Sequence, residues 1–102
     1  MAPRANLSDR ALADVSEAAR WIGRDSPASA RPLRRSVAGL TRRLGDFPLA
    51  GAVHPELAPE RYRFAGVNGF PYIAVYDASQ GPPIILRILH GARDLPEILR
   101  DL

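Results

Sequence analysis

The segment that most constrains the fold of this chain is an apolar run near its C-terminal end, Ile84 to Leu89, interrupted only by Arg87. Its β-branched residues favour a strand, the two prolines before it favour an abrupt start, and Gly91 favours an abrupt end. A strand that is apolar on both faces is typically central in its sheet, because both of its faces are covered there. We therefore expect residues 84–90 to form the central strand, with the rest of the chain packed around it.

Two segments with helical periodicity precede this strand. The first begins near Ser8 or Asp9, whose side-chain oxygens can cap a first turn, and the second opens at Ser26-Pro27. Both place apolar residues three and four positions apart, which predicts an antiparallel pair of helices with one buried face each. The first stripe is Leu12, Val15, Ala19 and Ile22, widened by Ala11 and Ala18, with Trp21 capping the core at its edge. The second stripe is Ala30, Leu33, Val37, Leu40, Leu44 and Phe47, with Pro32 disturbing the first turns and Gly45 following the helix end.

After residue 60 the pattern changes to alternation, which predicts strands. Asn68-Gly69 is a strong hairpin signal, and Pro71 can only stand at the start of the strand that follows it. The expected elements are strands at residues 61–65, 70–76 and 84–90, a weak edge strand at residues 5–7, and a short helix from Asp94 to Leu102. The predicted fold class is therefore α+β: an N-terminal helical hairpin packed on a small antiparallel sheet, with a short C-terminal helix.

Composition restricts the size and the setting of the protein. With 102 residues and 46% hydrophobic residues, we expect one globular domain over residues 1–102. No apolar run approaches the roughly 18 residues of a membrane span, and the N-terminal segment lacks the apolar core of a secretory signal. Cysteine is absent, which is compatible with a reducing compartment. We therefore expect a cytoplasmic protein.

The charge of the chain comes from an unusual set of basic residues. All 14 of them are arginine, and the net charge is +3. Arginine binds phosphate and carboxylate groups through two parallel hydrogen bonds, which favours an anionic partner. A GC-rich genome also raises arginine together with alanine, glycine and proline, which are frequent here, so both interpretations stay open. The positive charge favours an acidic partner under either of them.

One motif connects the chain to a known family. The motif is Ile85-Leu86-Arg87-Ile88-Leu89-His90-Gly91-Ala92-Arg93-Asp94. It resembles the I-L-R-V-L-H-G-A-R-D ending of the RelE/ParE toxins of type II toxin–antitoxin systems and differs from it at Ile88. The ParE branch is further indicated by Pro27, Phe47-Pro48, Pro55-Glu56-Leu57, Arg61-Tyr62-Arg63, Tyr72 and Tyr76. The resemblance covers nearly the whole chain, which then forms a single RelE/ParE-like domain.

The resemblance implies a toxin that a cognate antitoxin neutralises. For the ParE branch it implies a small acidic ParD-like antitoxin and inhibition of DNA gyrase, without sequence-specific DNA binding by the toxin alone. For the RelE branch it implies cleavage of mRNA on the ribosome. A third alternative is an inert member that retains antitoxin binding.

The residues themselves can be compared with the needs of RNA cleavage. That reaction requires a base, an acid, and cations that stabilise the charged phosphorane. RelE-like proteins resemble one another in supplying these groups from basic residues on the sheet and from a tyrosine or histidine near the C-terminus. Here Pro71 stands at one of the basic positions and Leu99 near the tyrosine position. The remaining set would be Arg61, Arg63, His90 and Arg93. We therefore expect a binding protein rather than a nuclease, with no cofactor and no metal.

Contacts with a protein partner are expected around the exit of the last strand. The candidate residues are Arg87, His90, Arg93, Leu95, Ile98 and Leu99. Arg87 is interpreted as a sheet-surface residue with a packed stem, and antitoxin contact is the alternative. His90 fits a hydrogen-bonded structural role, and Arg93 fits either a partner's acidic group or an internal pair with Asp94 or Asp101. We expect the sheet face opposite the helices to be partly covered, so that an acidic amphipathic antitoxin segment can complete it.

Overall fold

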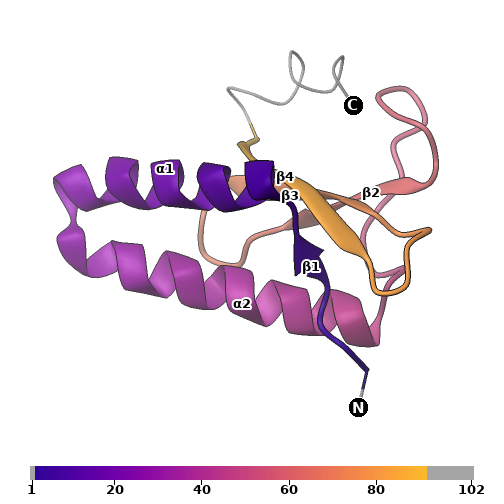
Figure 1. Cartoon of the computed structure of the whole chain (residues 1–102). Coiled ribbons are helices and arrows are strands. Elements are labelled where there is room, and N and C mark those ends of the chain that lie inside the picture. Colours follow the sequence, from indigo (N-terminus) through magenta and orange to yellow (C-terminus); the bar gives the residue numbers. More distant parts are fainter. Residues whose placement is uncertain (1, 92–102) are drawn as a thin grey trace.

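The computed structural model describes residues 2–91, which form two α-helices and a four-stranded sheet (Figure 1). In chain order the elements are β1 (Asn6–Leu7), α1 (Asp9–Asp25), a 3-10 turn (Pro27–Ser29), α2 (Ala30–Asp46), β2 (Tyr62–Gly66), β3 (Tyr72–Asp77) and β4 (Ile84–His90). The sheet order is β1-β4-β3-β2, with β1 parallel to β4 and the other pairs antiparallel. The predicted α+β class, the meander and the interior position of β4 are confirmed, but the sheet is mixed rather than antiparallel, because the edge strand β1 runs parallel to β4. The predicted helix from Asp94 to Leu102 lies outside the described residues.

The two helices begin where the sequence supplies a cap or a proline. Ser8 Oγ accepts a hydrogen bond from the amide of Ala11 at 3.1 Å, which fixes the start of α1. Pro27 opens the 3-10 turn, and α2 starts at Ala30. Pro32 therefore stands in the first turn of α2, where a missing amide donor costs no helical hydrogen bond. Neither helix in this part of the chain is long and apolar enough to cross a membrane.

The buried faces of the helices differ from the predicted stripes at two large residues. Leu12 and Phe47 are 51% and 66% exposed, so their assignment to the core was wrong, whereas Trp21, predicted at the edge of the stripe, is 53% exposed. The buried residues of α1 are Ala11, Val15, Ala18 and Ala19, whose small side chains let the helix lie close to β4. Leu12 follows Ala11 by one position, so its side chain points about 100° away from the buried Ala11 around the helix axis. Phe47 follows the end of α2 at Asp46, so it no longer shares the buried face, and Gly45 is inside the helix rather than after it.

A bulge in β4 decides which of its apolar side chains face the helices. Leu86 is an extra residue opposite the junction of Val75 and Tyr76. Ile85 and Ile88 are three positions apart, which would place them on opposite faces of a regular strand, yet both belong to the main core with the helices. The other face, which we expected to be partly covered, carries a second cluster of the buried residues Ala58, Tyr62, Phe64, Val75 and Leu89 with the partly buried Ile73 and Leu86.

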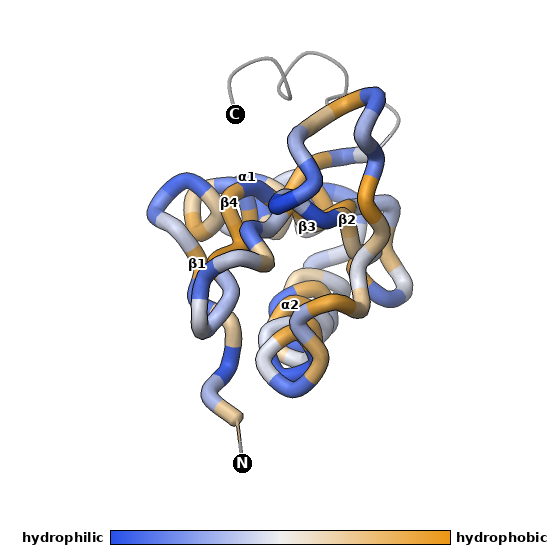
Figure 2. The backbone as a smooth tube through the Cα atoms, turned by 90° about the vertical axis from the view of Figure 1, so that its right-hand side faces the viewer, coloured by the Kyte–Doolittle hydropathy of each residue, from blue (hydrophilic) through white to orange (hydrophobic). Residues whose placement is uncertain are grey.

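Tyr76 ties the loop after α2 to the sheet. Its side chain is fully buried, and its hydroxyl donates to the carbonyl of Pro48 at 2.7 Å and accepts from the amide of Gly51 at 2.9 Å. Burial raises the pKa of this hydroxyl above its ordinary value. Tyr76 thus fixes residues 48–51, which directly follow α2, beside the strands. Figure 2 shows α2 nearly end-on below the sheet.

We expect Tyr76→Phe to lower the free energy of unfolding by about 1–3 kcal/mol, because the Gly51 amide and the Pro48 carbonyl would lose a buried partner. Urea unfolding followed by circular dichroism measures the loss. Tyr62→Phe is the matched control, since the Tyr62 hydroxyl accepts a bond from the exposed side chain of Arg61. The control should change the free energy by about 0.5 kcal/mol or less, and equal losses in the two variants would contradict the anchoring role of Tyr76.

Candidate functional site

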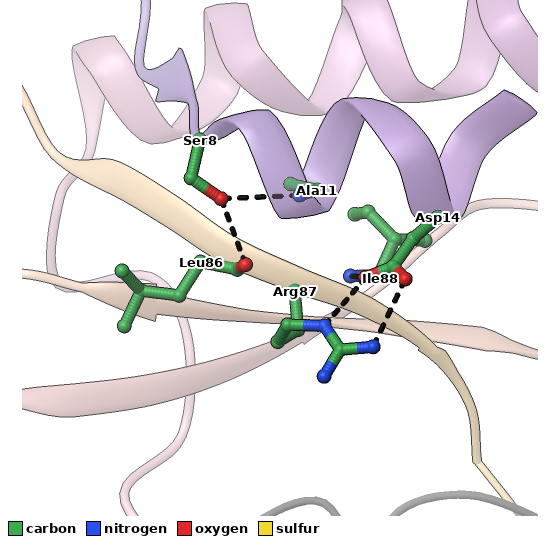
Figure 3. Close-up of polar contacts among 6 residues, drawn as sticks. All are labelled: Ser8, Ala11, Asp14, Leu86, Arg87 and Ile88. Carbon is green, nitrogen blue, oxygen red and sulfur yellow. Dashed lines mark hydrogen bonds and ion pairs between the residues drawn. The ribbon is translucent and has the colours of Figure 1, made fainter. Parts of the chain in front are cut away.

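The N-terminal half of α1 closes one edge of β4 (Figure 3). Within the described residues, β1 pairs with only the first two residues of β4, so a strand does not cover the rest of this edge. Side chains of Ser8 and Asp14 replace it. Ser8 Oγ donates to the carbonyl of Leu86 at 2.8 Å, and the amide of Ile88 donates to Asp14 Oδ2 at 3.0 Å. These bonds satisfy backbone groups that a bare edge would leave unpaired.

Arg87 forms a two-point ion pair with the same carboxylate. Its Nε donates to Asp14 Oδ2 at 2.8 Å and its Nη2 donates to Asp14 Oδ1 at 3.0 Å. Arg87 is 8% exposed, so its interpretation as a sheet-surface residue was wrong. The physical reason is that α1 brings Asp14 to the β4 edge, where one carboxylate serves both the Ile88 amide and the guanidinium group. Contact of Arg87 with a partner stays a prediction.

Arg61 and Arg63 lie at the end of the sheet where β2 begins. Arg63 Nη1 donates to the carbonyls of Leu49 at 3.2 Å and Gly51 at 2.8 Å, so this cation holds the loop after α2. Arg61 is exposed, and its Nη2 donates to the Tyr62 hydroxyl at 2.9 Å. That hydrogen bond raises the pKa of Arg61, so the guanidinium group cannot accept a proton as a general base.

Acidic and imidazole groups near this end do not supply the missing chemistry. Burial raises the pKa of Asp77, but hydrogen bonds from Ser79 and Gln80 and the charge of Arg61 outweigh it, so the pKa of Asp77 lies below its ordinary value. A carboxyl group with a lowered pKa is unsuited to protonate a leaving group at neutral pH. His54 Nδ1 lies 3.2 Å from Glu56 Oε1. Within residues 2–91, no group of three His, Asp or Glu side chains is placed to hold a metal ion.

His90 lies at the opposite end of the sheet from the two arginines. It ends β4, pairs with Tyr72, and packs edge-on against the Tyr72 ring with 5.6 Å between the centroids. Arg63 pairs with Tyr76 and His90 pairs with Tyr72, four residues before Tyr76 on β3. At about 3.3 Å per residue, Arg63 and His90 are about 13 Å apart along the strand direction. The structure therefore does not bring Arg61, Arg63 and His90 into one site.

The other predicted site residues follow β4. The amide of Gly91 donates to the carbonyl of Pro71 at 3.1 Å. Gly91 does not have a positive φ, and a Cβ at this position would meet Cδ1 of Ile73, the movable end of that side chain. The described residues end at this point. Arg93, Leu95, Ile98 and Leu99 lie outside them, and their roles stay predictions.

An apolar groove that was not predicted from the sequence lies between the two helices and β1. The groove has a volume of about 280 Å³ and is lined by Leu7, Leu12, Val15, Ser16, Arg34, Val37, Ala38 and Thr41. Leu12 is half exposed there, and the exposed Arg34 adds a positive charge. The signal for the groove in the sequence is a leucine beside an alanine-rich stripe, although helical spacing alone predicts that this leucine is in the core.

A comparison with known families fits this architecture. Residues 5–95 match the family model described as the ParE toxin of the type II toxin–antitoxin system parDE. The matched range contains every helix and strand described above. No curated protein matches the chain.

We expect Asp14→Ala to lower the free energy of unfolding by about 3 kcal/mol, because Arg87 would stay buried without its counter-charge and the Ile88 amide would lose its acceptor. Urea unfolding measures the change. Glu17→Ala, at an exposed position of the same helix, is the control and should cost about 0.5 kcal/mol or less.

A double variant separates the charge pair from simple truncation. Asp14→Leu combined with Arg87→Met removes both charges together, so it should be more stable than Asp14→Ala. An Asp14→Ala loss no larger than that of the Glu17→Ala control would show that the β4 edge does not depend on this carboxylate.

Proposed function

Because the chain belongs to the ParE toxin family of type II toxin–antitoxin systems, we propose that it inhibits DNA gyrase and is neutralised by a cognate ParD-like antitoxin. The observation that carries the proposal is the family match over residues 5–95, which includes the strand exit with the His90-Gly91 motif. Toxins of the ParE branch, which the sequence resembles, act on gyrase. A protein that acts on gyrase would act in the cytoplasm, and we include this location in the proposal.

The arrangement of basic and acidic groups supports a binding protein rather than a nuclease. RNA cleavage through the 2′-hydroxyl needs an acid, a base and cations around one phosphate. Arg63 is engaged with loop carbonyls, and His90 is about 13 Å away along the strands. The side chains of Arg61, Arg63 and His90 therefore cannot surround one scissile phosphate. A ribosome-dependent mRNA endonuclease that relies on Arg93 is the alternative, and an inert antitoxin-binding member is the third.

The groove between α1, α2 and β1 is suited to the antitoxin. Its lining combines apolar side chains from three elements with the positively charged Arg34. An amphipathic antitoxin helix would place apolar residues against Leu12 and Val37 and an acidic residue near Arg34. Half of the Leu12 side chain, which is otherwise exposed to water, would be covered in that complex.

We expect the purified protein to inhibit gyrase supercoiling of a relaxed plasmid and to leave translated mRNA intact. A stoichiometric amount of the antitoxin, encoded by the adjacent reading frame, should restore supercoiling. Gel electrophoresis of plasmid topoisomers measures the first effect, and primer extension on mRNA from a translating extract measures the second.

The opposite outcomes separate the alternatives. Normal supercoiling at a large molar excess of toxin would refute gyrase inhibition. Mapped cleavage of translated mRNA that disappears in Arg93→Ala would establish the endonuclease instead. Normal growth when the toxin is expressed without its antitoxin would favour the inert member.

We expect Leu12→Glu to weaken antitoxin binding by about tenfold or more, because a carboxylate would enter an apolar contact and repel an acidic partner. Isothermal titration calorimetry with the purified antitoxin measures the change. Leu57→Glu is the matched control, since Leu57 is 43% exposed on the loop before β2, away from the groove. Affinity that is unchanged in Leu12→Glu, or reduced equally in both variants, would exclude this groove as the antitoxin site.

A further inference from the structure

The positive charge of the protein is concentrated on one helix. α2 contains five arginines and a single acidic residue, Asp46, which is a net charge of +4. The whole chain has a net charge of +3, so all other residues together contribute −1. The arginines are Arg31, Arg34, Arg35, Arg42 and Arg43, and all five are exposed. The two ion pairs within residues 2–91, Arg87 with Asp14 and His54 with Glu56, involve none of them.

This arrangement does not stabilise the helix. Arg31 lies in the first turn of α2, which contains no acidic residue, so its charge opposes the helix dipole. Arg31 and Arg35 are also a like-charged pair four positions apart, which is unfavourable. Arg31, Arg34 and Arg35 have no acidic residue three or four positions away that could compensate. An anionic partner would remove this repulsion.

Three of the arginines form a row along the outer side of α2. At 100° per residue, Arg31, Arg35 and Arg42 lie within about 40° of one another, opposite the buried Leu33, Val37, Leu40 and Leu44. At a rise of about 1.5 Å per residue, the row is about 16 Å long.

A hollow of mixed polar and apolar lining lies beside this row. It has a volume of about 490 Å³ between α2 and the β2–β3 turn. Its lining residues are Pro32, Arg35, Ser36, Gly39, Leu40, Arg43, Gly66 and Asn68. The small residues Ser36 and Gly39 allow close approach of a partner's backbone between the two arginines. The hollow thus offers the guanidinium groups of Arg35 and Arg43 to a phosphate.

The same face lacks what other partners need. Protein interfaces are anchored by large apolar or aromatic side chains, but the exposed large apolar residues of the described chain lie outside α2: Leu12, Trp21, Phe47, Leu49 and Leu57. Single-stranded nucleic acids are bound through aromatic stacking, which the exposed side of α2 cannot provide. A straight cationic row without apolar anchors fits the phosphates of a duplex.

We propose that the outer face of α2, with Arg31, Arg35, Arg42 and Arg43, binds the phosphodiester backbone of a nucleic-acid duplex without reading its sequence. The proposal goes beyond gyrase inhibition and does not depend on it. The groove proposed for the antitoxin lies on the other flank of α2, where Arg34 lies, so the two surfaces are distinct.

The test is fluorescence anisotropy of a labelled 20-base-pair DNA duplex titrated with the full chain, at 50 to 200 mM salt and without gyrase. With four phosphate contacts, the logarithm of affinity should fall against the logarithm of salt concentration with a slope of about −3.6. Arg31→Gln combined with Arg35→Gln should reduce the slope by about 1.8 and weaken binding at 50 mM salt by tenfold or more. A second duplex of unrelated sequence and an RNA duplex should bind with affinities within about threefold of the first, since the contacts are to phosphates.

The matched control is Arg10→Gln combined with Arg20→Gln, which removes the same charge from exposed positions of α1. It should retain the slope. Arg31→Lys combined with Arg35→Lys keeps the charge and should retain most of the affinity, and urea unfolding verifies that all three variants are folded.

Four results would overturn the proposal. The first is the absence of duplex binding at 50 mM salt, and the second is an equal loss of duplex affinity in the α1 control. The third is a strong preference for one duplex sequence. The fourth is a loss of antitoxin binding without a loss of duplex binding in Arg31→Gln/Arg35→Gln. The last result would make α2 a protein-binding face instead.

Discussion

The edge of β4 is the constraint on which the rest of this structure depends. A strand with a bare edge exposes amide and carbonyl groups, and β1 is too short to cover more than the first two residues. α1 completes the edge with the Ser8 hydroxyl and the Asp14 carboxylate, and Arg87 neutralises that carboxylate from the strand. One side chain therefore connects residues that are 73 and 74 positions apart and fixes the helical hairpin against the sheet.

This connection also determines which surfaces remain for partners. Arg87 in the terminal motif pairs with Asp14, and Arg63 in β2 donates to carbonyls of the loop after α2. Both cations therefore stabilise the fold. Two surfaces suited to partners lie on the helical hairpin: the groove around Leu12 on one flank of α2 and the arginine row on its outer side. A toxin that acts by binding would use such surfaces, whereas a nuclease needs groups converging on one phosphate.

Local rules predicted the elements well because each depends on a few neighbouring residues. Ser8 caps α1, Pro27 opens the second helical segment, and Asn68-Gly69 turns between β2 and β3, where Gly69 has φ +83°. The predicted core failed at Leu12 and Phe47, because helical spacing alone cannot tell which side of a broad stripe meets the sheet. The relative positions of Arg61, Arg63 and His90 could not be predicted from the sequence, because strand pairing places the two arginines and the histidine at opposite ends of the sheet.

The sequence by itself determined the fold class, the element order, the central strand and the family, since periodicity, caps, turns and the terminal motif are properties of adjacent residues. Only the tertiary structure decided that Arg87 is buried by Asp14, that Leu86 is a bulge, and that Tyr76 holds the loop after α2. These features depend on distant segments meeting in a particular register. A shift of one residue in β4 changes which side chains reach the helices, and the pattern of a single strand does not encode that shift.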